Sequence, residues 1–536
     1  MNTISRLGKI EENFSRGPNF VWYASSFFIA FLMLAFAVIR IDFHADEAIY
    51  LAGVPFSLSN DSGVFFHVIY LALGWGTPTP VSTRWTSLIL GLVLIASSTR
   101  IVYRLVPEAN RWVAMLIPML IVVSYQGVFS ILRVRPEISW IAVSSVAALS
   151  LVELRFKKSL YWQVLLVVAL VLLPMNHLLA LLASVFFAGY IALFGRFFLG
   201  FRWSCISVAA LPIGLVINRG IRSWVVTGQV ELLPTIGAGL GGERGSIKDF
   251  LWNVFWNAPK FLSDTAATSS WWQVMFAQAK DGDGLHCIIS NSFWGAALLA
   301  PLFFKSWEQR YVAAIPLFSL IAFYSTGYFN PTYAPLLAIF GLLTFVVIFA
   351  NELCWSTKKT LAAMVIFVSL INGSSFLTTR VMNHGTATFF VTEASLRARL
   401  ASFPESYSIA VAERLQSVIP KHARAKSILF KEALPSDVDI VVVDHYDFEM
   451  YRFVPDYEVR RAEVETAVSQ MECSEQIVSP VYKRELLFDR VKQNQSIASE
   501  QGSWFFRNSV DYKITVLKSV HPAKIATLEI SEPFRK

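Results

Sequence analysis

The chain has 536 residues and a formal net charge of +8, and 55% of its residues are hydrophobic while only 16% are charged. Soluble domains usually carry about 25% charged residues, so the composition excludes an ordinary soluble protein and indicates an integral membrane protein. The positive charge does not indicate a nucleic-acid-binding protein, because the basic residues lie in short loops between apolar runs and form no continuous patch.

The first predicted element is an apolar run at residues 20–39, which is about 20 residues long and can therefore cross a bilayer. It follows a polar stretch that contains Arg6, Lys9 and Arg16, and it ends without a small-residue cleavage site. These features predict a retained membrane anchor whose N-terminal side lies in the cytoplasm.

Further apolar runs predict a mainly α-helical, polytopic membrane protein with about 11 transmembrane helices. The runs lie at residues 83–103, 112–132, 138–152, 162–173, 177–194, 204–217, 288–304, 312–325, 333–350 and 361–376. With the N-terminus inside, alternation places the connections that are rich in Lys and Arg, such as 155–158, in the cytoplasm. The first long loop, 41–82, holds no Lys or Arg and lies on the outer side.

Two outer loops interrupt the predicted membrane domain, which covers residues 1–379. The first, 41–82, contains an apolar stretch at 64–73 that is too short to span a bilayer and indicates a helix lying in the membrane interface. The second, 218–287, contains several tryptophans, which are typical of membrane interfaces and can also stack on sugars.

Residues 380–536 are predicted to form an extracytoplasmic domain. This segment holds 21 basic and 21 acidic residues, so the whole net charge of +8 belongs to the membrane domain. Its patterns indicate strands at 438–443, 512–517 and 524–530 and a helix around 464–471. We therefore expect an α/β or α+β domain.

Four ionisable residues crowd the exit of the first predicted span: Asp42, His44, Asp46 and Glu47. A carboxylate in this place can act as a general base on an acceptor hydroxyl. Adjacent residues of a helix do not share a face, so one of Asp46 and Glu47 can meet substrate while the other supports the site. The alternative is a solvated acidic helix end without a function. His44 beside two carboxylates permits a divalent cation but does not require one.

Arg133 and Arg135 lie between the third and fourth predicted spans, on the outer side, where the charge pattern disfavours them. Arginine suits a phosphate because its planar guanidinium donates paired, charge-assisted hydrogen bonds. The alternative is that both side chains reach outward to lipid headgroups.

Three further residues are candidates for substrate contact. His177 lies in a short outer connection, where a histidine packed at the interface is the alternative. Tyr328 and Asn330 precede the tenth predicted span, where they can equally belong to a proline-punctuated helix start with interfacial tyrosines.

The order of these residues resembles that in the membrane glycosyltransferases of the GT-C superfamily. The resemblance is to the branch that holds the protein O-mannosyltransferases and the aminoarabinose transferase that modifies lipid A. Asp46-Glu47 stands where that branch has an Asp-Glu pair after its first span. Residues 64–73, which include His67, resemble the aromatic-rich interfacial helix that follows, and the stretch from Arg84 to Gly91 resembles the second span.

Two later motifs extend this resemblance. Arg133-Val-Arg135-Pro-Glu137 is similar to the arginine-rich turn of the branch, with one residue fewer between the arginines and Glu in place of Asp. Residues 328–335 are similar to a late helix start that contains Tyr and Pro. The branch often has Lys-Pro-Pro before the interfacial helix, whereas residues 59–63 of this chain contain no Lys.

The resemblance implies an inverting transfer of a sugar from a polyprenyl-phosphate donor at the outer face of the membrane. Asp46 would be the base, Glu47 would support it, and Arg133 and Arg135 would stabilise the phosphate. Candidate substrate-binding residues are His44, His67, Arg84, His177, Tyr328 and Asn330. The acceptor would be a lipid, a glycan or a protein, and a divalent cation is the one possible cofactor. A bacterial inner membrane with a periplasmic or extracellular C-terminal domain fits.

Two other functions remain open from the sequence. A transporter or flippase of lipid-linked glycans would bind the glycan without turnover. The apolar runs carry no Asp, Glu or Lys near their centres, which disfavours ion-coupled transport. A non-enzymatic membrane assembly protein would instead tolerate the loss of Asp46.

Overall fold

The structure of the protein is a computed structural model, and the chain divides into two compact units. It describes residues 18–38, 63–73, 80–124, 127, 130–230, 293, 306, 309–310, 312–316, 335–352, 360, 363–371, 373–374, 377, 396–411, 415, 419–420, 423, 425–428, 434, 438–444, 457–469, 471–479 and 512–519. The mainly helical character that the sequence predicts is confirmed.

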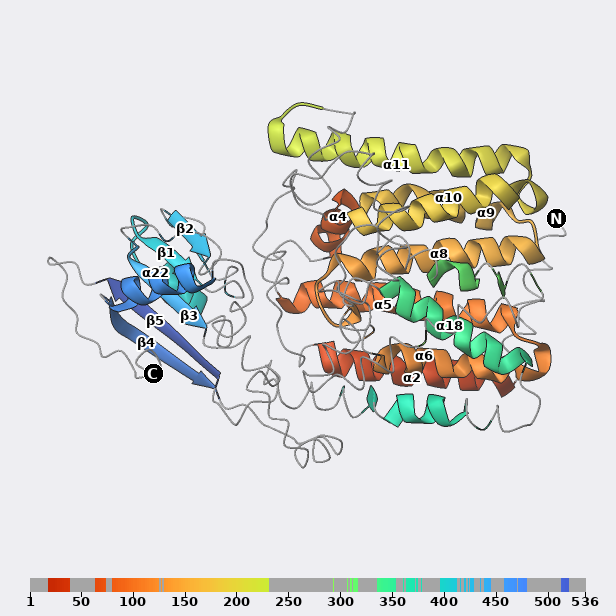
Figure 1. Cartoon of the computed structure of the whole chain (residues 1–536), viewed down its shortest axis with the longest axis horizontal. Coiled ribbons are helices and arrows are strands. Elements are labelled where there is room, and N and C mark those ends of the chain that lie inside the picture. Colours follow the sequence, from red (N-terminus) through yellow and green to blue (C-terminus); the bar gives the residue numbers. More distant parts are fainter. Residues whose placement is uncertain are drawn as a thin grey trace. The chain divides into compact units, whose positions relative to one another are not determined.

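The first unit is a bundle of helices whose long members run side by side (Figure 1). Its helices are α2 (Pro18–Val38), α4 (Val64–Leu73), α5 (Pro80–Leu105), α6 (Leu116–Val123), α8 (Pro136–Phe156), α9 (Leu160–Leu172), α10 (Leu178–Phe198), α11 (Phe201–Thr227) and α18 (Pro335–Glu352). Two short 3-10 segments are η1 (Glu108–Met115) and η2 (Leu173–Met175).

Four of the described helices are long and apolar enough to cross a membrane. They comprise Val21–Val38 of α2, Thr83–Leu105 of α5, Pro136–Phe156 of α8 and Phe201–Val225 of α11. The prediction of an integral membrane protein is confirmed, while the number of 11 spans stays a prediction. Helix α8 lies inside the bundle, because 94% of its apolar window is buried, compared with 22% for α2.

Helix α11 is longer than its apolar run. The run predicted at 204–217 corresponds to a helix that continues to Thr227, so residues 218–227 are helical rather than part of the outer loop. Arg219 and Arg222 end the apolar run without ending the helix, since arginine is a good helix former. The helix stops at Gly228, whose positive φ of 72° favours glycine.

The third predicted span, at 112–132, is not one continuous helix. It begins in η1, continues as α6, and breaks after Val123 at Ser124, whose backbone is extended. The Ser124 hydroxyl donates to the Ile121 carbonyl at 2.8 Å and accepts from the Gly127 amide at 2.9 Å. A serine that bonds to its own backbone in this way competes with helix continuation, which a hydropathy pattern does not reveal.

The second unit contains a five-stranded mixed sheet in the order β2-β1-β3-β5-β4. The strands are β1 (Ser408–Val411), β2 (Ala425–Ile428), β3 (Ile440–Asp444), β4 (Met471–Ser479) and β5 (Tyr512–Ser519), and α22 (Tyr457–Ser469) precedes β4. Strand β1 pairs in parallel with β2 and β3, whereas β5 pairs antiparallel with β3 and β4.

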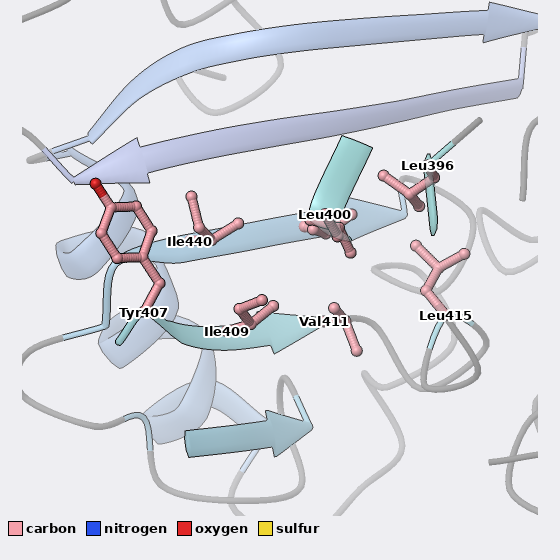
Figure 2. Close-up of a cluster of buried hydrophobic side chains, with 8 residues drawn as sticks. Leu396, Leu400, Tyr407, Ile409, Val411, Leu415 and Ile440 are labelled. Atoms are coloured by element: carbon pink, nitrogen blue, oxygen red, sulfur yellow. The ribbon is translucent and has the colours of Figure 1, made fainter. Parts of the chain in front are cut away.

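Alternation along the parallel strands builds the core of this second unit. Ile409 and Val411 of β1 and Ile440 and Val442 of β3 are buried on one face of the sheet, together with Leu400 (Figure 2). The strands expected at 438–443 and 512–517 are present as β3 and β5. The strand expected at 524–530 lies outside the described residues.

Candidate functional site

Helix α4 marks the end of the bundle where most of the described candidate residues gather. It lies at one end of the helical unit and packs against α5, α11 and η2 (Figure 1). The turn before α8 reaches the same end, because the Ser87 hydroxyl of α5 donates to the Arg133 carbonyl at 2.6 Å. We call this region the arginine end and define it by Arg84, Arg133 and Arg135.

We call the turn before α8 that carries Arg133 and Arg135 the arginine turn, and its conformation depends on Pro136. A residue before proline avoids helical dihedrals, and Arg135 is extended, with φ −140° and ψ 145°, while Pro136 opens α8. Glu137 lies in the first turn of α8, where a negative charge is favoured by the helix dipole.

Arg135 and Glu137 form a buried ion pair with two hydrogen bonds. Arg135 Nε donates to Glu137 Oε2 at 3.2 Å, and Nη2 donates to Oε1 at 3.0 Å. The two side chains are only 4% and 1% exposed. This pair fixes the plane of the Arg135 guanidinium.

Arg84 stabilises the C-terminal end of α2, the helix of the first predicted span. Its Nη1 donates to the carbonyl of Val38, the last residue of α2, at 3.0 Å, and the side chain is buried. Val38, the last described residue before the segment 39–62 that contains Asp46 and Glu47, therefore lies beside a buried arginine.

Gly63, the first described residue after that segment, also lies at this end. The Gly63 amide donates to the Asn176 carbonyl at 2.6 Å, and the Val64 amide donates to Asn218 Oδ1 at 2.9 Å. A side chain at Gly63 would put its Cβ 2.0 Å from the Met175 carbonyl oxygen, so only glycine allows this approach. The start of α4 is thus pinned to both η2 and α11.

The structure places five of the predicted site residues at the arginine end. His67 lies on α4, Arg84 on α5, Arg133 and Arg135 in the turn before α8, and His177 directly after Asn176. Their roles in binding stay predictions. The other candidates, His44, Asp46, Glu47, Tyr328 and Asn330, lie outside the described residues. Within the described ranges, no group of three His, Cys, Asp or Glu residues could hold a metal ion.

Several residues at this end were missed by the sequence analysis. Arg219 and Arg222 lie on the extended part of α11, near α4. A signal for them existed, since they follow an apolar run on its outer side, as Arg133 and Arg135 do. Tyr70 and Ser87 carried no signal, because their contact joins two helices and depends on packing.

His67 is held in its neutral form. Burial, and after it the positive charge of the nearby Arg222, lowers the pKa of His67 from 6.5 to about 4. A neutral imidazole can donate one hydrogen bond and accept another without adding charge to a region already rich in arginine.

We expect this lowered pKa of His67 to make the protein less stable in mild acid. The unfolded chain binds a proton at His67 near pH 6.5, whereas the folded protein does so only near pH 4. The free energy of unfolding should therefore fall as the pH drops from about 6.5 to about 4. Thermal unfolding of the wild type and His67→Gln across this range measures the effect, and the variant should lose less stability.

A second variant separates the two causes of this pKa shift. Arg222→Gln removes the neighbouring charge but keeps the burial, so its pH dependence should lie between those of the wild type and His67→Gln. Identical pH profiles for all three proteins would contradict the assignment to His67.

The comparisons with known proteins found similarity only among solved structures. No protein-family model matches the chain, and no curated protein sequence matches it. The crystal structure of ArnT from Cupriavidus metallidurans in the apo state aligns with 93% of this chain and 98% of its own, at 10% identity and a TM-score of 0.48. The same protein bound to undecaprenyl phosphate aligns with 93% of this chain and 97% of its own, at 10% identity and a TM-score of 0.45.

An archaeal protein is also similar. The oligosaccharyltransferase AglB from Archaeoglobus fulgidus, in complex with an inhibitory peptide and a dolichol-phosphate, aligns with 84% of this chain and 72% of its own, at 11% identity and a TM-score of 0.42.

Proposed function

We propose that the chain is a glycosyltransferase that moves a sugar from a polyprenyl-phosphate donor to an acceptor hydroxyl at the outer face of the membrane. One observation carries the proposal. Both described ends of the segment that contains Asp46 and Glu47 are held at the arginine end, at Val38 by Arg84 and at Gly63 by Asn176. The two described residues that flank the acidic segment therefore lie in the same region as the buried arginines.

The residue types at the arginine end suit an anionic ligand. Among the residues that the structure describes, the buried arginines there are Arg84, Arg133 and Arg135, and the buried carboxylate is Glu137. Arginine matches a phosphate through paired hydrogen bonds, and these are stronger where water is excluded. The ion pair with Glu137 orients Arg135 in advance, so little reorganisation is needed when a phosphate arrives.

The proposed reaction uses these groups as follows. The carboxylate of Asp46 takes the proton of the acceptor hydroxyl, and the hydroxyl oxygen attacks the anomeric carbon of the donor sugar. The bond from that carbon to the phosphate oxygen breaks, and the anomeric configuration inverts. Arg133 and Arg135 stabilise the charge that grows on the phosphate, which needs no proton to leave.

The proposal includes the placement of the protein. The arginine end and residues 380–536 face the outer side, and the N-terminus faces the cytoplasm, as the basic loops predict. A bacterial inner membrane is the proposed location.

Two measurements test the proposed function. One is the binding of a polyprenyl phosphate, and the other is the transfer of sugar from polyprenyl-phosphate donors. Undecaprenyl phosphate is the binding probe, measured by its effect on thermal unfolding of the purified protein. Radiolabelled undecaprenyl-phosphate monosaccharides, each incubated with an envelope extract, test transfer. We expect the wild type to bind the probe and transfer label. Arg133→Gln should weaken binding about 10- to 100-fold, because it removes charge-assisted hydrogen bonds of about 1.5–3 kcal/mol.

Arg155→Gln is the matched control, since Arg155 lies in the last turn of α8, at the end opposite the arginine turn. It should bind and transfer as the wild type does. Binding without transfer of any sugar would favour the flippase, and neither binding nor transfer would favour the assembly protein. Equal binding by wild type and Arg133→Gln would contradict the site.

A further inference from the structure

Two short hydrogen bonds in series link α4, α5 and the arginine turn. The Tyr70 hydroxyl of α4 lies 2.5 Å from Ser87 Oγ of α5, and Ser87 Oγ lies 2.6 Å from the Arg133 carbonyl oxygen. Tyr70 is 6% exposed, and Ser87 and Arg133 are more deeply buried. Water therefore does not compete for these bonds.

The chemistry of the three groups determines which atom is the donor in each of these hydrogen bonds. A carbonyl can only accept, so the single hydroxyl hydrogen of Ser87 is donated to Arg133. Ser87 Oγ must then accept from the Tyr70 phenol. The order is Tyr70 to Ser87 to Arg133, and consecutive hydrogen bonds of this kind strengthen one another.

The turn that accepts the second of these hydrogen bonds is not helical at Arg133. Arg133 lies between the helical residue Ile131 and the start of α8 at Pro136. Its carbonyl is fixed by Ser87, while two residues later the Arg135 side chain is fixed by Glu137. The turn is thus held at two points, and one of them depends on α5 and α4.

We propose that Tyr70 and Ser87 are positioning residues that set the place of the Arg133 guanidinium relative to the donor phosphate. This rests on the proposed function. Neither residue need touch the donor, because both act through the backbone of Arg133.

The test is a double-mutant cycle on the rate of sugar transfer, using Ser87→Ala and Arg133→Gln. Ser87→Ala should lower kcat by about 10-fold, with a smaller change in the KM for the donor, because the phosphate gains charge in the transition state. In the Arg133→Gln background the same substitution should change kcat less than about 2-fold. Tyr70→Phe, which keeps the ring beside Phe66, should lower kcat by about 3-fold.

Ser98→Ala is the matched control, because Ser98 is another fully buried serine of α5 and its hydroxyl has no hydrogen-bond partner among the residues that the structure describes. It should leave kcat unchanged. An equal loss from Ser87→Ala in both backgrounds, or an equal loss from Ser98→Ala, would overturn the positioning role. A wild type that transfers no sugar from any donor would overturn the proposed function instead, so the two failures are distinct.

Discussion

Asp46→Asn is expected to lower sugar transfer by about 1,000-fold while undecaprenyl phosphate still binds. The substitution keeps the size of the side chain and removes its capacity to accept a proton. The acceptor hydroxyl would then attack without a base, whereas the phosphate would still meet Arg133 and Arg135. The measurements are kcat at saturating donor and the thermal shift produced by undecaprenyl phosphate.

Asp61→Asn is the control for this prediction, because it makes the same chemical change in the same segment, 39–62. It should transfer sugar at close to the wild-type rate. Glu47→Gln should fall between the two, as expected of a supporting carboxylate. Wild-type transfer by Asp46→Asn would remove Asp46 from the mechanism.

Those parts of the helical unit that depend on long apolar runs could be predicted from the sequence. The starts of α5 and α8 lie within three residues of their predicted positions, since hydropathy reports the length of a span directly. The arginine turn could also be predicted, because Pro136 limits the backbone before it and the outer arginines break the charge pattern.

Features that depend on hydrogen bonding could not be predicted. The break at Ser124 follows from one hydroxyl bonding to the backbone, and serine occurs within many continuous helices. The contact between Tyr70 and Ser87 depends on how α4 packs against α5. Strand β4 was missed because residues 471–479 are largely polar and lack a clear alternation of apolar residues.

Two arginines were wrongly predicted to lie in a loop, because the helix that carries them continues beyond its apolar run. Arg219 and Arg222 looked like loop residues because the run stops at Ile217, yet the helix carries both to the arginine end. Arg135 was expected to serve a phosphate, and the structure shows that it also has a buried carboxylate partner within two residues. Sequence reasoning recognised the residue types but could not assign their partners.

The largest stability effect is expected at the opposite end of the bundle, at Glu153. This carboxylate is only 4% exposed and accepts hydrogen bonds from Arg100 Nε at 2.7 Å, Arg104 Nε at 2.9 Å and Arg104 Nη2 at 2.8 Å. Glu153 joins α8 to α5 at one end of the bundle. At the other end, the hydrogen bond from Ser87 to Arg133 joins α5 to the turn before α8. The two contacts together fix how the helices are aligned along their length.

Glu153→Ala should therefore lower the free energy of unfolding by about 1.5–3 kcal/mol, because a buried carboxylate with charge-assisted hydrogen bonds is lost, while Arg100 and Arg104, which are 32% and 29% exposed, still reach water. Glu153→Gln should cost less, since an amide oxygen can still accept one hydrogen bond. The control is Glu108→Ala, which breaks the ion pair of Glu108 and Arg111 at 3.0 Å, where the glutamate is 87% exposed. A surface pair of this kind contributes about 0–1 kcal/mol. Chemical unfolding of the purified protein measures the free energy of unfolding of all three variants. Equal losses from Glu153→Ala and Glu108→Ala would contradict the view that the burial of Glu153 makes its contact between α5 and α8 more stabilising than a surface pair.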